Sequence, residues 1–296
     1  MTPWTPHPFE HPTLVPADGS FRLADAPTRP PADQLDRAAN EAALKRDRRA
    51  LRDLQRALYA DDRFAFLIVL QAMDAAGKDG TIRHVLRGVN PAGCQVVSFK
   101  QPSAEELDHD FLWRVTRKLP ERGRIGVFNR SHYEEVLVVR VHPAILDGQR
   151  LPGYDPATIW DERLSAIRAF EGHLAANGTA IVKIFLHLSE QEQARRFLKR
   201  IDEPDKNWKF SSGDVRERRH WDAYQHAYEQ ALNATSRANA PWYCVPADDK
   251  RYARRTVAEI VRGTFEALPL AYPEPDPDDR AEMLRLREGL EKEAMR

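Results

Sequence analysis

The sequence has few of the features that mark secreted or membrane proteins. Its 296 residues contain only two cysteines, Cys94 and Cys244, which cannot build a disulfide framework and which fit a reducing cytoplasm. No run approaches the roughly 18 consecutive apolar residues of a membrane helix. Residues 1–12 hold neither a basic region nor an apolar stretch, so we expect no signal peptide. The sequence therefore predicts a cytoplasmic protein that does not interact with a membrane.

Net charge is also absent, because 45 Lys and Arg residues balance 45 Asp and Glu residues. A dedicated nucleic-acid binder usually carries a strong basic excess, so we expect no nucleic-acid partner. The ten histidines show no metal-binding spacing such as HExxH. With 42% hydrophobic residues, the length is sufficient for one large domain with a sizeable core, or for two small ones.

Composition divides the chain into three parts. Residues 1–32 hold eight of the 21 prolines, which predicts an extended, irregular arm lying along the surface. Residues 33–270 are predicted to form the folded domain, beginning with an amphipathic helix over 33–60. Six basic residues in 45–56 favour a solvated helix face, with an anion-facing or partner-facing helix as the alternative. Residues 271–296 predict a charged tail helix packed on the body or on a partner subunit.

Apolar strands alternate with amphipathic helices from residue 64 onward. The predicted strands are 64–70, 94–99, 124–129, 180–188 and 242–247. Helical patterns separate and follow them, near residues 80–88, 103–119, 133–142, 156–176, 189–200, 215–238 and 252–267. Strands separated by helices predict an α/β fold, in which a five-stranded parallel sheet lies between two helical layers.

A glycine-lysine loop follows the first strand directly. Residues 71–82, QAMDAAGKDGTI, lie between that strand and a predicted helix, which is the context that a phosphate-binding loop requires. Backbone amides in such a loop, together with the helix N-terminus, hold phosphate oxygens. The lysine of the loop places a compact cation on the transferring group. The predicted phosphate-binding residues are Ala75, Ala76, Gly77, Lys78, Asp79, Gly80 and Thr81.

The loop departs from the usual pattern G-x-x-x-x-G-K-[ST] at two positions. Ala72 replaces the first glycine, and Asp79 replaces the hydroxyl residue that normally ligates Mg²⁺. Asp74 is a hard oxygen ligand that could bind Mg²⁺, or Mn²⁺, in its place, although a capping role in the turn is the alternative. Asp79 is expected to cap the helix rather than to face phosphates with its carboxylate.

The third strand ends in polar residues, GVFNRSHYEE (126–135). In phosphate-loop kinases the neighbouring strand usually ends in an acid that organises Mg²⁺ or the attacking group. Here Asn129 holds that position, and its carbonyl can serve a metal but cannot take a proton. Arg130 follows. Glu134 and Glu135 are the nearby carboxylates, and stabilisation of the helix dipole is their alternative role.

A basic segment follows the fourth strand. Residues 195–219 contain nine Lys or Arg and five Asp or Glu, in two predicted helices joined by a loop that carries Lys206 and Lys209. Beside a phosphate loop, this segment predicts a lid that closes cations over phosphates, whereas alone it would indicate an exposed helical hairpin. Lys100 after the second strand and Arg114 are expected to extend the anion path.

Five ordered motifs carry a resemblance to a known family. They are MDAAGKDGTI, ELDHDFLWR, GVFNRSHYEE, RIDEPDKNWK and ADDKRYAR. Over roughly residues 10–270 the sequence resembles the polyphosphate kinase 2 family, the polyphosphate:nucleotide phosphotransferases. The resemblance implies a thymidylate-kinase-like P-loop fold, a helical lid, Mg²⁺, and reversible phosphoryl transfer between polyphosphate and adenine nucleotides. With Asn129 at the end of the third strand, the sequence resembles the subgroup of this family that phosphorylates both AMP and ADP.

By position in these motifs, Asp74, Lys78, Arg130, Arg200 and Lys209 match the family's loop aspartate, loop lysine, strand-end arginine and lid cations. The resemblance thus implies catalytic roles for Asp74, Lys78, Asn129, Arg130 and Arg200. It implies a metal site at Asp74 and Asn129. Nucleotide contacts are expected from Asn129, Arg130, Glu134 and Arg200.

Two other functions remain open at this point. An ATP-dependent nucleotide kinase would share the loop and the fold, and a non-enzymatic polyanion-binding protein would share the basic lid. A binder, however, has no need of a loop lysine and a loop carboxylate together. Helix 33–60 and the tail helix are candidate assembly surfaces, so we expect a homo-oligomer, a dimer or a tetramer.

Overall fold

The computed structural model describes Trp4 and residues 6–295. Its centre is a parallel sheet with the strand order β2-β3-β1-β4-β5. The strands are β1 (Ala65–Ala72), β2 (Cys94–Ser98), β3 (Ile125–Asn129), β4 (Thr179–His187) and β5 (Trp242–Pro246). The predicted five-stranded parallel sheet is confirmed, with strand ends within two residues of those expected.

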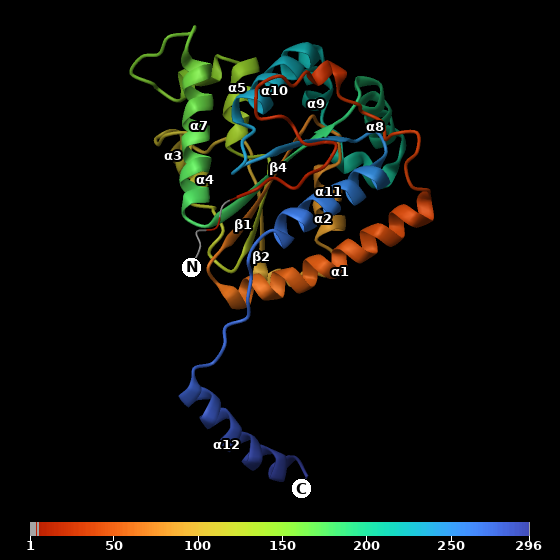
Figure 1. Ribbon diagram of the computed structural model, residues 1–296. Helices are drawn as coiled ribbons and strands as arrows, with labels where there is room; N and C mark the ends of the chain where they lie inside the picture. The colour runs from red at the N-terminus through yellow and green to blue at the C-terminus, as the bar shows by residue number, and fades with distance from the viewer. Residues whose placement is uncertain (1–3, 5, 296) are drawn as a thin grey trace.

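Helices connect and cover the strands (Figure 1). The α-helices are α1 (Arg37–Asp61), α2 (Lys78–Val85), α3 (Ala104–Leu107), α4 (Trp113–Thr116), α5 (Val138–Val141), α6 (Ile145–Gly148), α7 (Ile159–Ala176), α8 (Glu190–Asp202), α9 (Ser212–Glu217), α10 (Trp221–Thr235), α11 (Lys250–Glu266) and α12 (Pro277–Ala294). The 3-10 helices are η1 (Leu23–Asp25), η2 (Pro91–Gly93), η3 (His132–Val136), η4 (Pro204–Lys209) and η5 (Arg218–His220).

Two hydrophobic clusters on opposite faces of the sheet make the fold three-layered. Alternate residues of β1 show the division: Phe66 and Ile68 pack with α1, α2 and α11, whereas Leu67 and Val69 pack with α7 and α10. All eight residues of β1 are buried, as expected for a central parallel strand. The predicted α/β/α architecture is confirmed.

The N-terminal arm follows the β5 edge of the sheet. Leu14 forms an antiparallel bridge with Tyr243, and the Cys244 amide donates to the Thr13 carbonyl at 2.8 Å. The Phe9 ring lies so close to Gly263 that a Cβ there would be 2.2 Å from it. Backbone pairing and aromatic packing therefore hold the arm on the surface. The pairing also covers the edge of β5, which would otherwise have free backbone groups.

Some helix predictions differ from the structure. The expected helix over 103–119 is broken into α3 and α4, and the side chain of Asp110 accepts a hydrogen bond from the Leu112 amide in the intervening turn. Such local side-chain bonds compete with helix continuation. Among the described residues, no helix combines the length and apolarity needed to cross a bilayer.

The tail helix α12 extends away from the rest of the protein (Figure 1). None of its residues is buried, and Met283, Leu286 and Leu290 are 60%, 58% and 63% exposed. The prediction that this helix packs on the body is wrong. These apolar side chains contact nothing in the rest of the described chain, so packing of this helix on a partner subunit stays a prediction.

Candidate active site

The loop after β1 has the backbone conformation of an anion-binding turn. Ala75 and Gly77 adopt left-handed conformations, with φ of 63° and 104°. Left-handed residues interspersed among ordinary ones turn successive amides toward a common point, which makes a concavity for anions. Helix α2 begins at Lys78, so its N-terminal amides adjoin this concavity.

Lys78 folds back over the end of β1. Its Nζ donates to the Ala72 carbonyl at 2.7 Å and lies 3.5 Å from the Met73 carbonyl. Burial lowers the pKa of Lys78, and the charge of Asp74 opposes that effect. The ammonium is thus held beside the loop, with a neighbouring carboxylate favouring its charged form.

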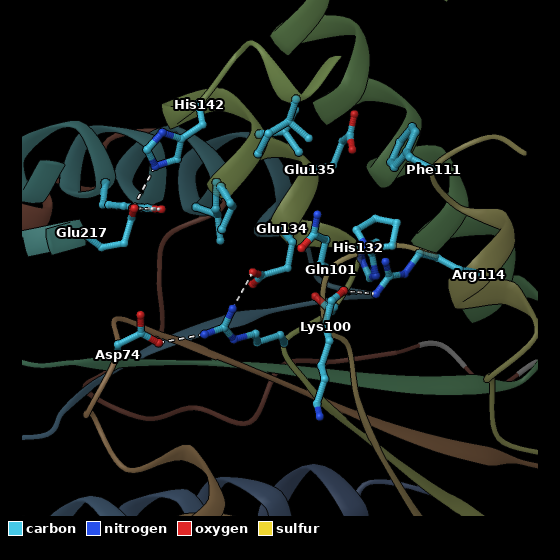
Figure 2. Close-up of a pocket in the computed structure, with 18 of the residues that line it drawn as sticks. Asp74, Lys100, Gln101, Phe111, Arg114, His132, Glu134, Glu135, His142 and Glu217 are labelled. Atoms are coloured by element: carbon cyan, nitrogen blue, oxygen red, sulfur yellow. Dashed lines mark hydrogen bonds and ion pairs between the residues drawn. The ribbon is translucent and has the colours of Figure 1, made fainter. Parts of the chain in front are cut away.

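Arg130 joins the loop to the end of β3. Its Nη2 donates to Asp74 Oδ1 at 2.8 Å, and its Nη1 lies 3.4 Å from Glu134 Oε2 (Figure 2). Although burial alone would lower it, these two carboxylates raise the pKa of Arg130. Burial raises the pKa of Glu134, against the charges of Arg130 and Lys78. Arg130 also has a φ of 63°, a strained conformation that often marks a functional site.

Asn129 lies at the end of β3 beside the phosphate loop. Its Nδ2 donates to Asp79 Oδ1 at 2.6 Å and to Ser98 Oγ at 3.2 Å. Its Oδ1 is buried and has no hydrogen-bond partner among the described residues. The carboxylate of Asp79 therefore accepts from Asn129, and the expectation that it caps α2 is wrong, because Gly77 occupies the cap position without a side-chain bond.

A cavity of about 660 Å³ opens beside these groups. Five predicted site residues line it: Asp74, Lys100, Arg114, Arg130 and Glu134. One part of its wall is apolar, with Leu107, Phe111, Val138 and Val139. Figure 2 shows Asp74 and Glu134 on one side of the space and Phe111 and Arg114 on another. The cavity thus combines a cation–carboxylate cluster with an apolar wall.

Lys100 and Arg114 line the cavity together and are joined by a hydrogen bond. Arg114 Nη2 donates to the Lys100 carbonyl at 2.7 Å, and Arg114 Nη1 lies 3.3 Å from Glu106 Oε2. Glu135, the second predicted carboxylate, is buried against Arg163 at 3.2 Å and accepts from Gln149. Glu135 is thus held in a structural ion pair, whereas Glu134 is paired with the strand-end arginine.

The predicted lid cations do not line the cavity in this structure. Arg200 donates to the Lys209 carbonyl at 3.2 Å and lies 3.4 Å from Asp214 Oδ2, so it bonds within the lid segment. Lys206 pairs with Glu203, and Lys209 lies over the exposed Trp208 ring. The catalytic and phosphate-binding roles expected of these three residues stay predictions.

Arg196 has a structural role at the phosphate loop that the sequence pattern did not indicate. It belongs to α8, within the basic segment, yet it is only 6% exposed. Its Nε donates to Glu192 Oε1 at 3.0 Å. Its two terminal nitrogens donate, at 2.6–3.2 Å, to the backbone carbonyls of Ala75, Ala76, Ala247 and Asp248. Arg196 therefore ties the phosphate loop to α8 and to the segment after β5.

The lid contacts the site through other residues, which the sequence analysis also missed. Arg218 donates to Gln193 Oε1 at 2.7 Å, and Gln193 Nε2 donates to the Asp74 carbonyl at 2.9 Å. His142 Nε2 donates to Glu217 Oε2 at 2.8 Å (Figure 2). Burial would raise the pKa of Glu217, but hydrogen bonds from His142 and Tyr224 lower it. The basic segment is thus joined to the cavity wall at two points.

A buried polar network supports the segment that carries Arg130 and Glu134. Lys183 of β4 is fully buried, and its Nζ lies 2.6 Å from Glu171 Oε2 and 2.9 Å from the Tyr133 hydroxyl. Tyr133 donates to Glu171 Oε1 at 2.8 Å, and His132 bonds to the same oxygen at 3.2 Å. His132 and Tyr133 lie between Arg130 and Glu134 in the chain, so the network fixes this segment against the sheet.

Comparisons with known proteins agree with this geometry. Residues 34–269 match the family model described as polyphosphate kinase 2. The chain is 60% identical over 242 residues to an ADP-polyphosphate phosphotransferase of Rhodopseudomonas palustris, covering 81% of this chain and 84% of the relative. It is 48% identical over 239 residues to an AMP/ADP-polyphosphate phosphotransferase of Meiothermus ruber, covering 81% and 85%.

A solved structure shows the same fold. The crystal structure of polyphosphate kinase 2 from Arthrobacter aurescens TC1 superposes with a TM-score of 0.85 at 39% sequence identity. The similarity covers 93% of this chain and 95% of that chain.

Proposed function

The chain belongs to the polyphosphate kinase 2 family, and we propose from this that it transfers phosphoryl groups from inorganic polyphosphate to AMP and ADP. The observation that carries the proposal is the ion cluster of Asp74, Arg130 and Glu134, which lies between the phosphate loop and the cavity of about 660 Å³. One side of this cluster can receive the donor phosphates and the other the acceptor nucleotide.

The cavity has the composition that an acceptor nucleotide requires. Its apolar wall, with Phe111 and Leu107, suits a base, and Arg130 with Arg218 can pair with the nucleotide phosphates. Asp74 and Glu134 hold Arg130 at 2.8 and 3.4 Å, so its guanidinium is positioned before any ligand binds. A preorganised cation of this kind stabilises charge that develops in the transition state.

The reaction needs positioning more than proton transfer. A terminal phosphate oxygen of AMP or ADP attacks the terminal phosphorus of polyphosphate, the bridging P–O bond breaks, and the shortened polyphosphate leaves with the bond's electrons. The attacking oxygen is already anionic, so Asn129 in place of an acid does not block the reaction. Lys78 and Arg130 neutralise the charge that builds up on the transferring group. The same geometry serves the reverse direction.

Magnesium fits the oxygen donors at the loop. Mg²⁺ is commonly held by one or two protein ligands together with substrate phosphates. Asp74 has a carboxylate oxygen that does not bond to Arg130, and Asn129 Oδ1 is buried without a partner among the described residues. These two residues would hold Mg²⁺, or Mn²⁺, which would supply charge neutralisation for the phosphates. Among residues 4 and 6–295, no three His, Cys, Asp or Glu side chains are grouped for metal binding, so substrate oxygens would complete the shell.

Chromatography of nucleotides tests the proposed function. Purified protein incubated with AMP, polyphosphate and Mg²⁺, and with no nucleoside triphosphate present, is expected to form ADP and then ATP. Formation of ADP only when ATP is the donor would instead support an ordinary nucleotide kinase. Salt-sensitive binding of polyphosphate without any nucleotide product would support a non-enzymatic binder.

We also propose a cytoplasmic homo-oligomer. Cys94 and Cys244 are free thiols, which suits the reducing compartment where adenine nucleotides are made and used. Helix α12 exposes Met283, Leu286 and Leu290 at spacings of three and four residues, the spacing of a helix–helix contact. Light scattering on the purified protein tests for a dimer or tetramer, and a monomer at micromolar concentration would refute this part.

A further inference from the structure

A second cavity, also of about 660 Å³, shares no lining residue with the cavity described above. Its walls come from α1, α2 and α11, the helices that cover one face of the sheet (Figure 1). Seven Lys or Arg side chains line it, against a single carboxylate, Glu41. A protein with no net charge thus gathers a strong local excess of cations at one place.

These cations have almost no acidic partners. Glu41 pairs with Arg37 outside the cavity, and Arg52 pairs with Asp53 at 3.2 Å. The other six form no ion pair with a carboxylate in the part of the chain that the structure describes: Lys45, Arg48, Arg49, Arg87, Arg251 and Arg254. Ordinary surface arginines usually find partners or spread apart, so an unpaired cluster around a concave space points to an external anion.

The two half-buried arginines of the cavity, Arg48 and Arg254, are held by hydrogen bonds while like charges surround them. Arg48 Nε donates to the His84 carbonyl at 2.5 Å. Burial, followed by the charge of Arg87, lowers the pKa of Arg48. Burial, followed by the charges of Arg83 and Arg48, lowers the pKa of Arg254. A bound polyanion would relieve this repulsion without requiring the arginines to move.

Hydrogen bonds join the wall of the basic cavity to the phosphate loop. Arg254 Nη1 donates to His84 Nε2 at 3.2 Å, and His84 Nδ1 donates to the Gly80 carbonyl at 2.6 Å. Gly80 belongs to the loop motif, and a Cβ at this position would lie 3.3 Å from Arg254 Nη2. One face of α2 therefore serves the phosphate loop, while the adjoining face contributes to the basic cavity.

We propose that this basic cavity binds the part of a polyphosphate chain that lies far from the reacting end. The inference rests on the proposed function and deepens it, because it assigns a second contact region for the donor. A chain long enough to occupy both regions gains affinity through high effective concentration, whereas a short chain reaches the phosphate loop alone. The cavity makes the enzyme selective for long donors.

A triple variant on α1 tests this selectivity. Lys45→Gln, Arg49→Gln and Arg52→Gln remove three exposed cations from the cavity and retain helix-forming residues. With long-chain polyphosphate, kcat/KM is expected to fall by about tenfold, since exposed charge pairs each contribute a modest factor. With the shortest chain that the wild-type enzyme uses, kcat/KM is expected to stay within about twofold. The magnitude of the slope of log(kcat/KM) against log[salt] should fall by about two for the long chain.

The matched control removes three exposed cations elsewhere. Arg56→Gln, Lys118→Gln and Arg168→Gln change the net charge equally but leave the cavity intact. Equal losses for long and short chains, or equal losses in the control, would overturn the inference. If the wild type forms no nucleotide product from polyphosphate, the proposed function fails. Salt-dependent binding of long-chain polyphosphate to wild type and variant would then decide the cavity's role independently.

Discussion

Replacement of Arg196 by glutamine is expected to destabilise the protein and to impair phosphate binding. Arg196 is 6% exposed and donates to four backbone carbonyls and to Glu192. Glutamine is too short to reach both groups of carbonyls, so at least two acceptors lose their partner, and Glu192 keeps Arg195 as its one remaining counter-charge among the described residues. Breaking a buried ionic network from one side costs about 3–5 kcal/mol. For a domain of this size that loss lowers Tm by about 6–20 °C.

The assay is thermal unfolding followed by circular dichroism, together with kcat for AMP phosphorylation at a temperature where the variant is folded. Arg195→Gln is the matched control, because Arg195 is the neighbouring residue, is 62% exposed and pairs with the same Glu192 at 3.1 Å. Its loss is expected to cost less than about 1 kcal/mol. Because Arg196 fixes the carbonyls of Ala75 and Ala76, its replacement should also lower kcat. A Tm for Arg196→Gln within about 2 °C of the Arg195→Gln value would refute this reasoning.

Three further predictions concern pH, metal and assembly. Burial lowers the pKa of Lys183 to about 8, below its value of about 10.4 in an unfolded chain, so the unfolded state holds the extra proton between these pH values. Relative to the double variant Lys183→Met/Glu171→Gln, the wild type should therefore gain up to about 3 kcal/mol of unfolding free energy from pH 8 to 10.4. Urea unfolding measures this, and a difference between the two proteins that does not change with pH would contradict the lowered pKa. Asp74→Asn should raise the Mg²⁺ concentration for half-maximal turnover by at least about tenfold, and an unchanged requirement in a Mg²⁺ titration would exclude Asp74 as a ligand. Deletion of residues 277–296 should reduce the oligomer's mass in light scattering while leaving Tm within a few degrees, and an unchanged subunit number would exclude α12 as an assembly surface.

The layered fold was predictable because its signals are local. Each strand is a short apolar run, and each long helix repeats its apolar residues every three or four positions. The phosphate loop was predictable because strand, glycine-lysine loop and helix are consecutive in the chain. The broken helix over 103–119 was not, since the turn at Asp110 depends on a side-chain bond that periodicity does not report.

Side-chain direction accounts for what the sequence could not indicate. Arg195 and Arg196 are adjacent and of the same residue type, yet one is exposed and the other is buried against the phosphate loop. Lys183 interrupts an apolar strand, and only the fold shows that Glu171 from α7 meets it. The basic cavity needs residues from α1, α2 and α11, which lie far apart in the sequence, so no window along the chain could contain it.

The assignment of Lys78 to the transferring phosphate is tested most directly by one rate comparison. The measurement is the initial rate of ADP formation from AMP and polyphosphate, with Mg²⁺ and without nucleoside triphosphate, for the wild type and for Lys78→Ala. Loss of a preorganised charge that stabilises the transition state typically costs about 10²–10³ in kcat, and that loss is expected here, with Tm little changed. A Lys78→Ala rate near that of the wild type would contradict the placement of phosphoryl transfer at this loop.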